Sequence, residues 1–185
     1  MAKAKIVEWK EIESEIVYKK YARKIKKTLF ELPDGSTDEF YLKVEGPAAS
    51  VLALTSNNEV VLVRQYRPGP KLLLDELPGG YVDSGEDPKE AARREFKEET
   101  GYDGDFEFIG TCLDDAYSTM QRYCFIARNC SKVGEPQYSS NDQAQVVLLP
   151  LADFRKLLRN GQMTDVEVGY LGLDYLGLLN TSEEK

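Results

Sequence analysis

The sequence contains no histidine, and its three cysteines form no Cys-x-x-Cys pair. The first absence excludes a histidine base, and together they argue against a zinc site or a disulfide framework. Acid–base chemistry must then fall to carboxylates, lysine, tyrosine or metal-bound water. We expect Cys112, Cys124 and Cys130 to be reduced thiols packed in or near strands.

Long apolar runs are also missing. No stretch approaches the ~18 residues of a membrane span, and the first residues include no apolar segment typical of a signal peptide. We therefore expect a cytoplasmic protein with no membrane partner.

Acidic residues outnumber basic ones, which gives a formal net charge of −8. Such a surface repels nucleic acid over most of its area, so no nucleic-acid partner is expected. Phosphate groups would have to be bound at a local site that has its own cations, either a metal or a few arginine and lysine side chains. The chain is otherwise an ordinary globular mixture, with 42% hydrophobic and 30% charged residues.

The order of predicted elements is strands, one helix, strands and then two helices. Residues 1–45 read as a small antiparallel β module, with a turn at Pro33–Ser36, and residues 46–185 as the main domain. This order predicts an α/β fold in which a mixed sheet packs between helices. In the main domain we expect strands over 49–55, 60–65, 106–112, 122–127 and 145–149, and helices over 89–100, 151–158 and about 165–179.

The predicted helix over 89–100 begins after Asp87-Pro88, a capping pair, and ends at Gly101. At 100° per residue, Glu95, Glu98 and Glu99 fall within one arc of roughly 100°. Ala91 and Ala92 share this face, so small side chains are expected to leave room for a ligand. A fourth carboxylate, Glu86, precedes the helix in a glycine-containing loop.

Four converging carboxylates repel one another and need cations. Arg94 supplies one positive charge, and hard oxygen ligands suit Mg²⁺ or Mn²⁺. Such a metal neutralises phosphate charge and acidifies a bound water. The alternative interpretation is a solvated acidic helix that follows a tight loop.

Residues 80–102 resemble the Nudix box, Gly-x5-Glu-x7-Arg-Glu-U-x-Glu-Glu-x-Gly-U, where U is a bulky apolar residue. Every specified position is satisfied: Gly80, Glu86, Arg94, Glu95, Phe96, Glu98, Glu99, Gly101 and Tyr102. The resemblance implies the Nudix α/β/α sandwich and Mg²⁺-dependent hydrolysis. It also implies roles for the box residues: Glu95 and Glu99 as principal metal ligands, Glu86 as an auxiliary ligand, Glu98 as a ligand or base, the Gly79 carbonyl as a further ligand, and Arg94 as the residue that orients the carboxylates.

The resemblance continues over about residues 9–175, where several segments look like the ADP-ribose pyrophosphatase branch. They are Trp9, Val17-Tyr18, residues 32–35, 61–67 and 76–80, and Gly161–Asp165. This branch cleaves ADP-ribose and other nucleoside diphosphate sugars into a nucleoside monophosphate and a sugar phosphate. Its members are usually homodimers in which an N-terminal β module swaps onto the partner.

The same resemblance implies substrate contacts. An aromatic residue of the N-terminal module would stack on the base, and the candidates are Trp9, Tyr18 and Tyr21. Each of them has core packing as its alternative. Arg67 is a candidate for binding the diphosphate, and its alternative is a structural ion pair with Glu76 or its neighbours.

Two departures from the branch leave the substrate open. The proline expected about 15 residues past the box is missing from residues 113–118. The loop at 140–145 carries Asp142 near the position of the usual catalytic glutamate. The base is therefore Asp142 or Glu98, or catalysis is organised differently, and a sugar nucleotide other than ADP-ribose is a serious candidate.

Three other functions compete with this one. A Nudix hydrolase of dinucleotides or nucleoside triphosphates is the first, although the N-terminal module argues against the smallest triphosphate-cleaving type. A sensor that binds a nucleotide without cleaving it is the second, although the complete set of carboxylates argues against it. Decapping of RNA is disfavoured by the acidic charge.

Overall fold

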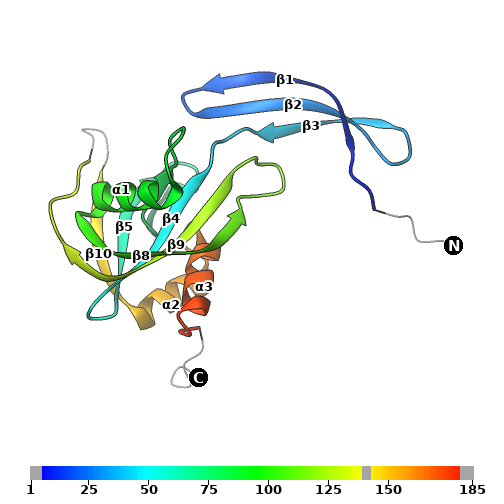
Figure 1. Ribbon diagram of the computed structural model, residues 1–185. Coiled ribbons are helices and arrows are strands. Elements are labelled where there is room, and N and C mark those ends of the chain that lie inside the picture. The colour runs from blue at the N-terminus through cyan, green and yellow to red at the C-terminus, as the bar shows by residue number, and fades with distance from the viewer. Residues whose placement is uncertain (1–5, 139–142, 180–185) are drawn as a thin grey trace. The chain divides into compact units, whose positions relative to one another are not determined.

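The computed structural model describes residues 6–138 and 143–179. The chain divides into two compact units (Figure 1). The N-terminal unit comprises Met1–Gly46 together with Leu113–Met120, and the main unit comprises Pro47–Cys112 together with Gln121–Lys185. Each unit is described separately below.

The N-terminal unit is an antiparallel meander of three strands, β1 (Lys10–Lys20), β2 (Arg23–Glu31) and β3 (Thr37–Lys43). Its β2–β3 turn forms as the sequence predicts, because the Asp34 carboxylate accepts a hydrogen bond from the Ser36 amide at 3.0 Å and Gly35 takes a positive φ of 83°. The segment Leu113–Met120 joins this unit through Lys43, whose ammonium group pairs with Asp114 at 2.7 Å.

The main unit is built on a seven-stranded mixed sheet with the order β10-β5-β4-β9-β8. β6 pairs with β5, and β7 pairs with β4. The β4–β9 pair is parallel and the β4–β5 pair is antiparallel, which confirms the predicted mixed sheet. The strand bounds are β4 (Ala48–Thr55), β5 (Glu59–Arg67), β6 (Leu72–Glu76), β7 (Gly79–Tyr81), β8 (Tyr102–Leu113), β9 (Gln121–Lys132) and β10 (Ala144–Pro150).

Strands β4 and β5 form a fork rather than a continuous ladder. They pair at Leu54 and Val60, next to their connecting turn. Further along, β5 pairs with β6 instead, and β4 pairs with β7, which aligns Ser50 with Gly79. The segment from β6 to β7 therefore fills the fork, and it places Glu76 and Gly79 inside the sheet.

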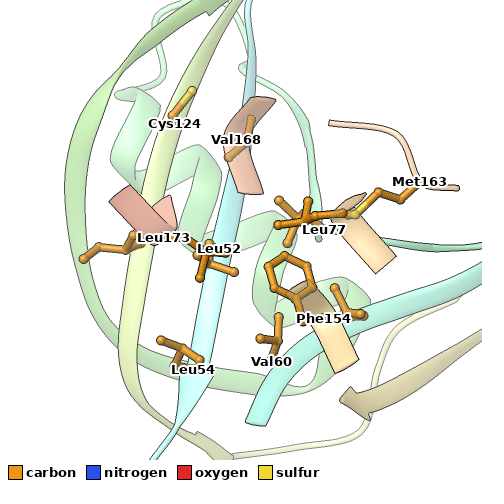
Figure 2. Packing of buried hydrophobic residues seen from close by; sticks show 12 residues of the cluster. Leu52, Leu54, Val60, Leu77, Cys124, Phe154, Met163, Val168 and Leu173 are labelled. Carbon is orange, nitrogen blue, oxygen red and sulfur yellow. The ribbon is translucent and has the colours of Figure 1, made fainter. Parts of the chain in front are cut away.

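Three helices cover the two faces of this sheet: α1 (Pro88–Thr100), α2 (Leu151–Asn160) and α3 (Val166–Tyr175). Alternate residues of β4 face opposite sides. Val51 packs with Phe96 of α1, while Leu52 packs with Phe154 of α2 and Leu173 of α3. Figure 2 shows the second of these clusters between the sheet and the C-terminal helices. The predicted α/β/α sandwich is confirmed.

Several element ends differ from the sequence-based expectation. Strands β8 and β9 extend beyond the apolar stretches, because backbone pairing continues through polar residues that face solvent. Helix α3 ends at Tyr175 rather than near residue 179, and Gly177 takes a left-handed φ of 67° just after it. Cys112 lies in β8, and Cys124 and Cys130 are buried in β9; all three are free thiols, as expected. Within the described ranges, no helix is long and apolar enough to cross a membrane.

Candidate active site

Helix α1 is fixed at both ends by the residues that predicted it. The Asp87 carboxylate accepts from the Lys89 amide at 2.9 Å, Pro88 opens the first turn, and Gly101 takes the left-handed φ of 73° at the end. The expectation for the two alanines of this helix was wrong. Ala91 and Ala92 are fully buried against the sheet and leave no open space for a ligand.

Arg94 gathers three of the four predicted carboxylates. Its Nε and Nη2 atoms donate to the two oxygens of Glu86 at 2.9 and 3.0 Å. Its Nη1 atom donates to Glu95 at 2.7 Å and to Glu98 at 3.5 Å. The guanidinium group, followed by the Asp83 amide, lowers the pKa of Glu86 to about 2. The geometry therefore suits the orienting function predicted for Arg94.

Glu99 occupies a different environment on the same helix. Its carboxylate accepts a hydrogen bond from the Gly79 amide at 2.9 Å. Burial raises the pKa of Glu99 to about 7; the nearby charge of Glu95 adds to this rise, while the positive charge of Arg67 opposes it. A cation bound next to Glu99 would stabilise the charged form of this buried carboxylate.

The two glycines of β7 are required by space. A Cβ atom on Gly80 would lie 2.5 Å from Cδ of Glu95, and a Cβ atom on Gly79 would overlap the carbonyl oxygen of Ala49. Neither glycine has a positive φ. Their missing side chains let the strand lie directly against the carboxylates of α1.

The donor chemistry of these residues fits a divalent metal. Glu86, Glu95, Glu98 and Glu99 offer hard oxygen ligands, and their charge exceeds that of Arg94. In the part of the chain that the structure describes, no three acidic side chains are already arranged as a metal cage. Arg94 and the Gly79 amide hydrogen-bond carboxylate oxygens of Glu95 and Glu99.

A cavity of about 240 Å³ opens beside these carboxylates. The segment after β9 helps to form it, because the Gln137 amide donates to the Glu98 carbonyl at 2.6 Å and the Tyr138 hydroxyl donates to the Glu99 carbonyl at 2.8 Å. The lining residues are Val63, Gln65, Glu95, Glu98, Glu99, Gln137, Tyr138 and Ala144.

Sequence reasoning missed five residues of this cavity: Val63, Gln65, Gln137, Tyr138 and Ala144. The only available signal was Gln65, a polar residue two positions after Val63 on an apolar strand, where alternation places both on one face. Gln137 and Tyr138 lie between β9 and β10, where the sequence predicted no helix or strand.

Arg67 is the last residue of β5, and its Nε atom pairs with the Glu76 carboxylate at 2.6 Å. The ion pair with Glu76, which was the alternative interpretation of Arg67, is thus present. Its guanidinium group is half-exposed, and Nη1 and Nη2 have no hydrogen-bond partner among the described residues. The pair with Glu76 therefore leaves Arg67 able to bind an anion.

The three predicted base-stacking residues belong to the N-terminal unit. Trp9 packs against Phe40, with ring centroids 5.2 Å apart, and also contacts Phe30. Tyr18 lies exposed on β1, and Tyr21 lies exposed in the β1–β2 turn with a φ of 53°. The predicted base Asp142 falls outside the described residues.

The NUDIX domain family model matches residues 44–168. The methanol dehydrogenase activator of Bacillus methanolicus is 36% identical over 99 residues, which cover 54% of either chain. The ADP-ribose pyrophosphatase of Bacillus subtilis is 27% identical over 151 residues, or 80% of this chain and 81% of that protein. A crystal structure of an ADP compounds hydrolase superposes with a TM-score of 0.77 at 18% identity, and the match covers 94% of this chain and 98% of that one.

The family model, together with the sandwich fold and the glutamate-rich helix beside a cavity, identifies a Nudix-type hydrolase. The family model spans well over half of the chain, and the chain therefore belongs to the NUDIX domain family. The alignment with the Bacillus methanolicus protein spans only about half of that protein's length. The substrate must accordingly be argued from the site.

Proposed function

We propose that this Nudix hydrolase uses Mg²⁺ to split the pyrophosphate bond of a nucleoside diphosphate sugar. Water adds to one phosphorus and the bridging oxygen leaves with the other, which gives a nucleoside monophosphate and a sugar phosphate. The observation that carries the proposal is that Glu95, Glu98 and Glu99 line one cavity, while Arg67 follows Val63 and Gln65 on the face of β5 that also lines it. The same face of the sheet thus carries carboxylates that can bind a metal and an arginine that can bind a diphosphate.

Similarity to proteins that act on this class of compound supports the proposal. The Bacillus subtilis relative is an ADP-ribose pyrophosphatase, and its alignment covers four-fifths of this chain. The missing proline in residues 113–118 still argues for testing sugars other than ADP-ribose.

We assign the metal to Glu95 and Glu99 as principal ligands, with Glu86, Glu98 and the Gly79 carbonyl as further ligands. Bound Mg²⁺ (or Mn²⁺) would neutralise phosphate charge and acidify the attacking water. Arg94 keeps the carboxylates in place, since it contacts Glu86, Glu95 and Glu98 together.

The remaining roles are substrate binding and proton transfer. Arg67 would bind the diphosphate through Nη1 and Nη2, because arginine forms paired hydrogen bonds with phosphate oxygens. Glu98 and Asp142 are the two candidates for the base. Glu98 is the more exposed of the two glutamates nearest to Arg94 on α1, at 45% of its side chain against 20% for Glu95.

We also propose that the protein is a homodimer in which the N-terminal unit docks on the partner chain. Every residue of β1 is exposed, including the apolar Ile12, Ile16 and Val17. A strand with this much uncovered apolar surface needs a partner. Trp9, Tyr18 or Tyr21 would then stack on the base of the substrate.

The cytoplasmic location expected from the sequence stays a prediction.

The test is phosphate release with Mg²⁺ in an assay coupled to a phosphatase. The panel contains ADP-ribose, other nucleoside diphosphate sugars, dinucleotides and nucleoside triphosphates. Cleavage of a diphosphate sugar above all others would support the proposal and name the substrate. Activity only on triphosphates or dinucleotides would overturn the substrate class, and metal binding without any turnover would favour the sensor alternative.

A further inference from the structure

Glu76 is the only acidic side chain that is buried among the described residues, with 1% of its surface exposed. It ends β6 inside the fork between β4 and β5. One carboxylate oxygen accepts from the Thr164 hydroxyl at 2.6 Å, and the other accepts from Nε of Arg67 at 2.6 Å. The proposed mechanism does not use Glu76.

Burial of a carboxylate is costly, and an apolar residue of similar size often stabilises a core at least as well. The neighbouring Leu74 and Leu77 are buried apolar residues of the same segment. Stability alone therefore does not account for a charge at position 76. The two strong contacts of Glu76 point instead to a function in holding another group.

That group is the guanidinium of Arg67. Glu76 accepts from Nε only. The N–H groups of Nη1 and Nη2 therefore stay available, because no described residue accepts a hydrogen bond from them. A guanidinium held at one edge presents the other edge in a fixed plane, which suits two oxygens of a phosphate.

Arg67 also lies on the correct side of the sheet. Val63, Gln65 and Arg67 alternate along β5, and the first two line the cavity together with the carboxylates of α1. Its partner Glu76 also lies three residues before Gly79, whose amide donates to the cavity-lining Glu99 at 2.9 Å. Thr164, in the connection between α2 and α3, donates its hydroxyl to the other oxygen of Glu76.

We propose that Glu76 and Thr164 are positioning residues that set the orientation of Arg67 for the diphosphate of the substrate. This inference rests on the proposed function. Neither residue touches the substrate, and both act through Arg67.

The first test compares Glu76→Gln with Asp75→Asn in the full-length enzyme with Mg²⁺ and the best diphosphate sugar of the panel. Glu76→Gln keeps the size of the side chain but removes the negative charge that holds Nε of Arg67, and its amide nitrogen cannot accept the hydrogen bond that the Thr164 hydroxyl donates. We expect KM to rise roughly 10-fold with kcat within about 2-fold, the pattern of a lost contact made equally in ground and transition states. An unchanged KM would overturn the proposal.

Asp75→Asn is the control because Asp75 precedes Glu76 and forms the other ion pair of this hairpin, with Arg64, at 2.6 and 2.8 Å. Arg64 and Asp75 lie outside the cavity lining, so KM should stay at the wild-type value. An equal rise in KM for Asp75→Asn would show that any loss of an ion pair in this hairpin has the same effect, which would also overturn the proposal.

Two further comparisons separate positioning from folding. In an Arg67→Ala background, Glu76→Gln should change KM by less than about 2-fold, because the residue through which it acts is gone. Thr164→Val should raise KM, and Thr164→Ser, which retains the hydroxyl, should restore it. Additive effects of the Arg67 and Glu76 substitutions, or no rescue by serine, would count against the proposal.

If the wild-type protein cleaves no diphosphate sugar, the proposed function fails while the positioning inference remains testable. Pyrophosphate with Mg²⁺ is then the probe, and calorimetry measures its affinity. Weaker binding by Glu76→Gln than by Asp75→Asn would support the positioning of Arg67. Equal binding by both variants and the wild type would overturn it.

Discussion

The Glu95 carboxylate lies where a side chain on Gly80 would be: a Cβ atom on Gly80 would lie 2.5 Å from the carboxyl carbon of Glu95. Gly80 lies in β7 and pairs with Ala49 of β4, so the strand cannot move away without breaking the sheet. Glu95 is in turn held by Arg94 at 2.7 Å. Gly80, the first residue of the Nudix box, is therefore needed to leave room for Glu95, one of the two proposed principal metal ligands.

Gly80→Ala should displace the Glu95 carboxylate and reduce turnover by roughly 10²-fold, since misplacement of a catalytic group by about 1 Å has an effect of this size. Activity at saturating Mg²⁺ measures the change. The control is Gly134→Ala, because a Cβ atom there meets nothing within 4 Å and the backbone φ is not positive. Wild-type activity in Gly80→Ala would contradict the assignment of Glu95.

The proposed metal ligands can be tested by charge removal. Glu95→Gln and Glu99→Gln should abolish turnover and weaken Mg²⁺ binding, because each removes a hard anionic ligand. Glu90→Gln, the same change on an exposed residue of the same helix, should leave both unchanged. Circular dichroism checks that the fold is retained. Full activity in the Glu95 or Glu99 variant would remove that residue from the metal site.

The raised pKa of Glu99 predicts a pH dependence of stability in metal-free protein. In the folded state this carboxyl keeps its proton up to about pH 7, whereas its ordinary value is 4.5. The folded state binds more protons between these limits, so the free energy of unfolding falls as pH rises through them, by up to roughly 3 kcal/mol.

Urea denaturation in EDTA at pH 5 and pH 8 measures this effect. The wild-type protein should lose stability relative to Glu99→Gln at pH 8, and added Mg²⁺ should restore it. A constant difference between the two proteins at both pH values would show that Glu99 is not desolvated in solution.

The sequence predicted most of what local rules control. The capping pair Asp87-Pro88 and the stop at Gly101 bound the helix correctly, and its period placed Glu95, Glu98 and Glu99 together. The apolar run over residues 49–55 correctly predicted a buried strand. These features depend on neighbours within a few positions, which a sequence displays directly.

What the sequence could not show depends on long-range pairing. No strand was expected over residues 72–81, and β6 and β7 form there because the fork between β4 and β5 offers them partners. Likewise, the contact between Glu76 and Thr164 joins positions 88 residues apart. Gln137 reaches the cavity because its amide binds the end of α1, which no local pattern reveals.

The identity of the base requires two substitutions. Asp142→Asn should slow kcat by about 10²-fold or more if Asp142 is the base, the usual effect of an acid–base group. Glu98→Gln should have this effect if Glu98 is the base. The pH profile of kcat distinguishes them, because removal of the base also removes the acidic limb of the profile. If both variants keep that limb, neither residue is the base.

The proposed dimer predicts that a charge placed on β1 separates the chains. Ile16 is 50% exposed and pairs with Lys26 of β2, so Ile16→Glu should leave the meander folded while preventing the burial of this strand by a partner. Light scattering should show a dimer for the wild-type protein and a monomer for the variant. Val133→Glu puts the same charge on an equally exposed apolar residue outside the N-terminal unit and should remain a dimer.

Deletion of residues 1–45 should also give a monomer or an insoluble protein, because it removes the whole proposed interface. A fully active, soluble product of that deletion would show that the N-terminal unit contributes neither to assembly nor to the active site.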